Sequence, residues 1–79
     1  MFSLDQKLQL ILNRALPAES KIRLEVNPIP SHLGYPVTII KNGMGLETFH
    51  IHHYAAIRLV EEGYEWTIHT GKERRLNNE

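Results

Sequence analysis

The sequence contains no cysteine among its 79 residues. A disulfide framework and a zinc site built on thiolates are therefore both excluded. A domain of this length buries a smaller fraction of its surface than a large domain, so its stability is modest unless another interaction adds to it. Two such interactions remain open, namely self-association and metal binding through histidine.

An excess of charge of either sign is also absent, because nine basic residues balance nine acidic residues. A dedicated nucleic-acid-binding protein usually carries a basic excess, since the neutralisation of phosphates drives its affinity. No apolar run approaches the roughly 20 residues that span a bilayer. The first residues lack the basic and apolar segments of a signal peptide. We therefore expect a cytoplasmic protein with no membrane partner.

Recognised catalytic motifs are missing as well, because the sequence has no G-x-S-x-G, no phosphate-binding glycine loop and no H-E-x-x-H. A histidine beside a carboxylate can transfer protons near neutral pH. A chain with five histidines and nine acidic residues offers such pairs by chance, however. We therefore predict a protein that is not an enzyme and has no cofactor. These features are typical of small accessory proteins, including those of phages and mobile elements.

Apolar residues at helical spacing open the chain and predict a helix over about Leu4–Leu16. Ser3 and Gln6 have the spacing of a capping box, which satisfies backbone donors at the start of a helix. Pro17 marks the exit from the helix. The alternation of apolar and polar residues that follows predicts a half-buried strand over 21–26.

A β-hairpin is predicted next. Asn42-Gly43, a dipeptide favoured in type I′ turns, separates apolar strands at Val37–Lys41 and Leu46–Ile51. A second helix is predicted over about His52–Glu62. It ends at Gly63, a residue suited to a left-handed C-terminal cap.

The last predicted element is a strand in which Tyr64, Trp66 and Ile68 alternate with polar residues. The order of elements is therefore α-β-β-β-α-β. We predict the α+β class, a two-layer sandwich in which two helices cover one face of a mainly antiparallel sheet. In this prediction residues 1–71 form a single domain and residues 72–79 form a polar, flexible tail.

The hairpin places apolar residues on both faces of the sheet. If the helices cover one face, Ile40 or Leu46 remains on the open face, and the preceding loop adds Tyr35 as a candidate. An apolar patch of this kind marks a protein-binding or dimer surface, although isolated exposed apolar residues are normal. Small sheets also have unpaired edge strands, and the strand over 21–26 is a candidate. The favoured hypothesis is a non-catalytic interaction or regulatory module that forms a homodimer through Tyr35, Ile40 and Leu46.

A second hypothesis is binding to nucleic acid. Lys21 and Arg23 share the polar face of the first strand, and Arg74 and Arg75 lie in the tail. Exposed tyrosines next to such a basic patch can stack on bases. The glutamates interleaved with these residues favour instead an ordinary mixed-charge surface.

A third hypothesis rests on the sequence His50-Ile51-His52-His53. Residues two apart in a strand point to the same side, so His50 and His52 can offer two imidazoles to one metal ion, with His69 as a third ligand. Imidazole nitrogens suit zinc, copper and nickel. A metal site or a small enzyme would follow from this arrangement. The simpler interpretation places His50 on a solvated strand face and His52 at the start of a helix.

Overall fold

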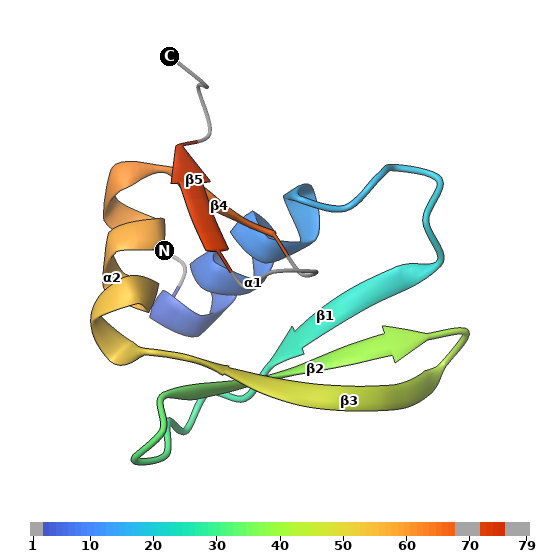
Figure 1. The fold of residues 1–79 in the computed structure, drawn as a ribbon, viewed down its shortest axis with the longest axis horizontal. Coiled ribbons are helices and arrows are strands. Elements are labelled where there is room, and N and C mark those ends of the chain that lie inside the picture. The colour runs from blue at the N-terminus through green and yellow to red at the C-terminus, as the bar shows by residue number, and fades with distance from the viewer. Residues whose placement is uncertain (1–2, 68–71, 76–79) are drawn as a thin grey trace.

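The computed structural model describes residues 3–67 and 72–75. In chain order the elements are α1 (Leu4–Arg14), β1 (Ile22–Val26), β2 (Tyr35–Lys41), β3 (Met44–Ile51), α2 (His53–Glu62), β4 (Tyr64–Thr67) and β5 (Lys72–Arg75). The α+β class and the order α-β-β-β-α-β are confirmed, and β5 adds one further strand. Figure 1 shows that both helices lie on the same side of the sheet formed by β1, β2 and β3.

The three strands β1, β2 and β3 form an antiparallel sheet with β2 at its centre. The predicted turn between β2 and β3 is present, because Asn42 and Gly43 have φ angles of 54° and 80° and a type I′ turn requires positive φ at both residues. Beside this turn the register shifts between Ile39 and Ile40. A bulge therefore interrupts the ladder at the end of the sheet nearest the hairpin turn.

Helix α1 begins as the sequence predicts. The backbone N–H of Ser3 donates to Oε1 of Gln6 at 3.0 Å, as in a capping box. Asp5 and Arg14 lie in the first and last turns, where the helix dipole favours their charges. The helix ends at Arg14, with Ala15 as its C-cap, and so stops short of the predicted end.

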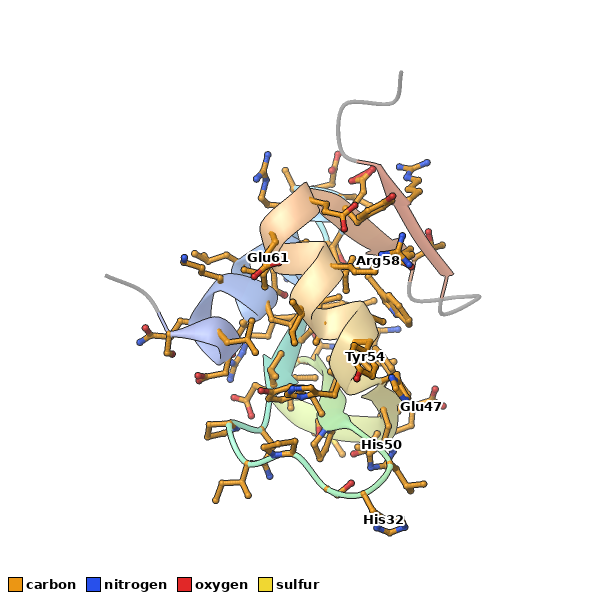
Figure 2. The ribbon with its side chains drawn as sticks, turned by 90° about the vertical axis from the view of Figure 1, so that its left-hand side faces the viewer. His32, Glu47, His50, Tyr54, Arg58 and Glu61 are labelled. Carbon is orange, nitrogen blue, oxygen red and sulfur yellow. The ribbon has the colours of Figure 1, made fainter. Side chains whose placement is uncertain are left out.

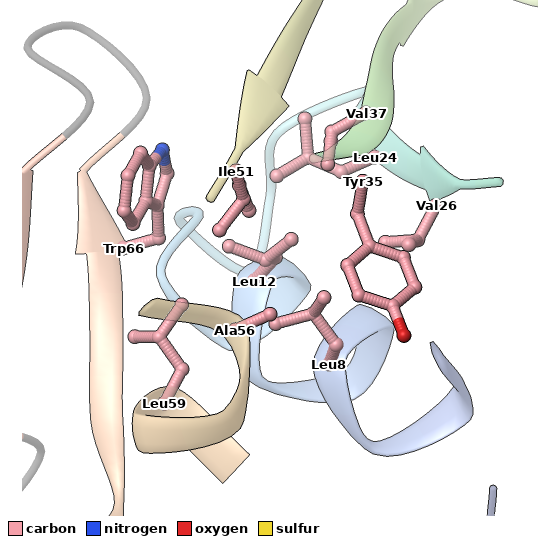
Figure 3. Close-up of a cluster of buried hydrophobic side chains, with 10 residues drawn as sticks. All are labelled: Leu8, Leu12, Leu24, Val26, Tyr35, Val37, Ile51, Ala56, Leu59 and Trp66. Carbon is pink, nitrogen blue, oxygen red and sulfur yellow. The ribbon is translucent and has the colours of Figure 1, made fainter. Parts of the chain in front are cut away.

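The hydrophobic core lies between the helices and the inner face of the sheet (Figure 3). Its largest fully buried side chains come from both helices and all three strands of the sheet: Leu8, Leu12, Leu24, Val37, Ile51 and Leu59. Helix α1 contacts β1, α2 and β4. It therefore packs against the second helix and against one strand of each sheet.

Strand β4 does not join the three-stranded sheet. It pairs with β5 in a separate antiparallel sheet. Trp66 of β4 instead stacks on Phe49 of β3, with ring centroids 6.2 Å apart and planes at 4°. The two sheets thus meet through side chains in this region. Ile68 and His69, predicted to continue the strand, lie outside the described residues.

Residues 72–75 form strand β5, where the sequence predicts a flexible tail. Ion pairs connect this strand to earlier parts of the chain. Nε of Arg74 lies 2.7 Å from Oε2 of Glu65, and Nη1 of Arg58 lies 3.0 Å from Oε1 of Glu73. In the sequence these charged residues indicate a solvated tail, because their partners Glu65 and Arg58 come close only when β4 and α2 are folded.

Arg58 connects α2 to both strands of the small sheet. Besides its ion pair with Glu73, its Nη2 donates to the hydroxyl of Tyr64 at 3.3 Å. This hydrogen bond, followed by the charge of Glu73, raises the pKa of Arg58 above its usual value. The guanidinium therefore stays charged across the pH range in which proteins are studied.

Candidate interaction surface

The outer edge of β1 is closed by polar side chains of the neighbouring segments. The backbone N–H of Leu24 donates to Oδ1 of Asn13 at 2.7 Å, and Nδ2 of Asn13 donates to the Leu24 carbonyl at 3.1 Å. The N–H of Val26 donates to Oε1 of Gln9 at 3.4 Å. Side chains thus accept from the outward-facing N–H groups of Ile22, Leu24 and Val26. A strand edge whose donors are occupied in this way is protected from pairing with another strand.

Asn13 is the main contributor to this closure, and its loss should be measurable. We expect Asn13→Ala to lower the free energy of unfolding by about 2 kcal/mol, because the backbone groups of buried Leu24 lose their partners. Urea unfolding followed by circular dichroism measures this change. Gln9→Ala is the control, because it removes only the longer bond to Val26, and we expect it to cost less than about 1 kcal/mol. Equal losses in the two variants would contradict the role of Asn13.

Strand β3, by contrast, directs backbone groups outward from the sheet. Successive residues of a strand point their N–H and C=O groups to opposite edges. The backbone groups of Leu24 point away from β2, and Leu24 lies opposite Ile39. The backbone groups of Ile39 therefore point away from β1 and toward β3, where Ile39 pairs with Glu47. The N–H and C=O groups of Glu47 point toward β2. Thr48 and His50 lie one and three residues further along the strand, so their N–H and C=O groups point away from β2.

No described residue covers these groups. Within 3–67 and 72–75, no hydrogen bond reaches the outward backbone groups of Thr48 or His50. Every residue of β3 except Phe49 and Ile51 is exposed, and the strand carries neither the lysine nor the proline that often protects an edge. Figure 2 shows Glu47 and His50 along the same side of the molecule as Tyr54 of α2. The outer edge of β3 is therefore available to another strand.

The sheet face turned away from the helices carries the predicted apolar residues. The hydroxyls of Thr38 and Thr48 lie 3.0 Å apart on this face, and Ile40 and Leu46 share it because each is two residues from one of these threonines. Leu46 is 58 % exposed. Ile40 is half-buried and lies over Gly45, where an added Cβ would be 4.0 Å from its Cδ1. The participation of Ile40 and Leu46 in binding stays a prediction.

Tyr35 does not belong to this surface, because it is only 6 % exposed. The sequence places it in a loop, but it is the first residue of β2, opposite Ile51 and on the core side with Val37. Its ring stacks on that of His53, with centroids 5.7 Å apart. The alternation of Tyr35 with Val37 was the signal that the strand begins earlier. The burial of Tyr35 corrects the prediction that it contacts a partner.

His50 and His52 do not share a strand face. Strand β3 ends at Ile51, and His52 is the N-cap of α2, where its Nδ1 accepts a hydrogen bond from the N–H of Tyr54 at 3.3 Å. His69 lies outside the described residues. Across the described part of the chain, no group of three or more His, Cys, Asp or Glu side chains is placed to hold a metal ion. His50 is therefore on an exposed strand and His52 is at the start of a helix, as the simpler interpretation of the sequence expects.

The basic residues considered for nucleic-acid binding are distributed over two sheets. Arg23 lies on β1, where Nη1 is 2.8 Å from Oε2 of Glu25, and Arg74 lies on β5, paired with Glu65. Lys21 precedes β1 and is exposed. Arg75 belongs to β5, but its side chain lies outside the described part of the structure. The pairing of both arginines with glutamates agrees with a mixed-charge surface.

A cavity of about 300 Å³ lies between the end of α1, the start of β1 and the small sheet. Leu16, Ile22 and Trp66 contribute apolar walls. Nε1 of buried Trp66 has no hydrogen-bond partner among the described residues. The volume is at the lower end of the range for small-molecule sites, roughly 300–1,000 Å³. One unpaired donor in a largely apolar wall does not define a class of ligand.

Comparison with known proteins gives no match, because the sequence fits no family model and is not significantly similar to a curated protein or a solved structure. Neither helix of the described residues has the length and apolar character needed to cross a membrane. The contrast between the two edges of the sheet is therefore the main guide to function.

Proposed function

We propose that the protein is a non-catalytic interaction module that binds another polypeptide by strand addition at the outer edge of β3. The observation that supports this is the difference between the two edges of one sheet. Side chains occupy the outward groups of β1, whereas the described residues leave those of Thr48 and His50 without a partner. Natural proteins usually cover an edge that must remain alone, so an uncovered edge in the same sheet marks a binding site.

Side chains near this edge supply apolar area for the added strand. Leu46 and Met44 are 58 % and 68 % exposed, and both belong to β3. Ile40 of β2 lies on the open face beside them. In strand addition, main-chain hydrogen bonds provide much of the affinity and side chains at alternate positions provide the specificity. The predicted role of Ile40 and Leu46 is therefore part of the same proposal.

The test separates the backbone of Thr48 from its side chain. We expect Thr48→Pro to abolish binding, because proline has no N–H and its ring obstructs the edge. The fold should survive, since the lost N–H faces away from β2. Thr48→Ala is the matched control, because both variants lose the hydroxyl contact with Thr38 and only the proline loses the donor. Circular dichroism and urea unfolding establish that both variants are folded.

The measurement is affinity capture from an extract of the native cells, with bound proteins identified by mass spectrometry. Wild type and Thr48→Ala should retain the same partner, which can be untagged copies of the chain itself, and Thr48→Pro should lose it. Retention of that partner by folded Thr48→Pro would contradict strand addition at β3.

A further inference from the structure

We infer that the strand added to β3 is β3 of a second copy of this chain, in an antiparallel pair centred on Thr48; this inference rests on the proposed function. The first argument is the number of available edges. In the main sheet the described chain has one closed edge, at β1, and one open edge, at β3. Pairing two copies through β3 uses the open edge of each main sheet and leaves the closed edge of each main sheet outside. The result is a finite two-fold dimer with a continuous six-stranded sheet rather than an open-ended filament.

The direction of the backbone groups limits the register in which the two copies of β3 can pair. The outward-facing residues are Thr48 and His50, and Leu46 precedes Thr48 by two positions. A two-fold axis at Thr48 places this residue opposite its own copy, so the two chains exchange two N–H···O bonds there. The same register places Leu46 of one copy opposite His50 of the other. The exposed stretch between the bulge and the start of α2 is thus used in full.

Neighbouring registers are less favourable for physical reasons. An axis at Glu47 would set two glutamate side chains directly opposite each other, and like charges at that position repel. An axis at Phe49 would set Leu46 opposite His52, which has left the strand and caps α2, so Leu46 would have no partner in the ladder. The axis at Thr48 places Glu47 opposite Phe49 of the second copy instead. Glu47 is the only acidic or basic residue between Leu46 and Phe49, so this register opposes no like charges.

The chain contains no cysteine, so single introduced cysteines can report the register of the dimer by forming disulfides. In a hydrogen-bonded antiparallel pair the opposed Cα atoms are about 5.5 Å apart, within the range of about 4.4–6.8 Å that a disulfide spans. Purified Thr48→Cys should therefore form a covalent dimer under mild oxidation. Thr38→Cys is the control, because it lies on the same face but on the central strand. A mixture of Leu46→Cys and His50→Cys chains should link to each other, and each alone should link much less.

Sedimentation of the purified wild-type chain over a range of concentrations gives the mass of the particle. We expect twice the monomer mass at high concentration, together with a disulfide at Thr48→Cys and none at Thr38→Cys. A monomer at all concentrations would overturn the second copy as partner, whereas the capture experiment with Thr48→Pro and Thr48→Ala judges strand addition separately. A dimer that links through Glu47→Cys and not through Thr48→Cys, nor in the mixed pair, would overturn the register.

Discussion

Gly34→Ala is expected to lower the free energy of unfolding by about 3 kcal/mol or more, enough to unfold much of a small domain at ambient temperature. Gly34 has a φ of +114°, a conformation that side chains rarely adopt, and an added Cβ would be 2.2 Å from the carbonyl oxygen of Ile51. That oxygen belongs to the backbone, so it cannot move away as a flexible side chain can. The contact fixes the loop before β2 against the junction of β3 and α2.

Gly43→Ala is the matched control for Gly34→Ala. Gly43 also has a positive φ, +80°, but an added Cβ would meet no atom within 4 Å. Its cost is therefore conformational alone, about 1 kcal/mol. Urea unfolding of both variants gives the difference. Similar losses would show that Gly34 is required for its φ angle and not for the close approach to Ile51.

Trp66→Ala should cost about 3–5 kcal/mol, because it removes a large buried ring and leaves a cavity. Trp66 is 8 % exposed, and its ring stacks on Phe49. The indole therefore holds the small sheet against the main one. Trp66→Phe should cost much less, since it keeps a ring at the stacking position and Nε1 has no described hydrogen-bond partner to lose. Both values come from urea unfolding followed by far-ultraviolet circular dichroism, because these variants lack tryptophan fluorescence.

Tyr54→Ala is the surface control for the tryptophan variants. Tyr54 is 73 % exposed, and substitutions at such positions usually change stability by less than about 0.5 kcal/mol. A loss in Trp66→Phe as large as that in Trp66→Ala would mean that Nε1 makes an essential hydrogen bond in solution.

The elements of this fold follow largely from local chemistry that the sequence displays. The turn at Asn42-Gly43 and the helix stop at Gly63, with a φ of 72°, are present because these residues accept positive φ. The strand predicted from the alternation over 21–26 is present as Ile22–Val26, since that alternation is unbroken. Each of these features depends on residues that are close in the chain.

Strand ends were predicted less well where proline is involved. The sequence places Pro36 in a loop before β2, because glycine and proline in this stretch are typical of loops. In the structure the Pro36 carbonyl accepts from the N–H of Asn27, just beyond the end of β1 at Val26. The nitrogen of Pro36, which has no hydrogen to donate, thus faces Asn27, where β1 has already ended. This is why β2 starts at Tyr35 and why Tyr35 is in the core.

The sequence alone determined the helices, the hairpin and the apolar face of each strand, because their signals lie within a few neighbouring residues. Only the tertiary structure decided which sheet edge is free. Asn13 and Leu24 are 11 residues apart, and Gln9 and Val26 are 17 apart. No local sequence pattern therefore predicts that side chains of α1 bind the outer edge of β1. The tertiary structure also decided that β4 pairs with β5 apart from the main sheet, which it meets through the stack of Trp66 on Phe49. Hydrogen bonds and ring contacts between distant segments form only when the chain is folded, and these contacts leave β3 as the open edge.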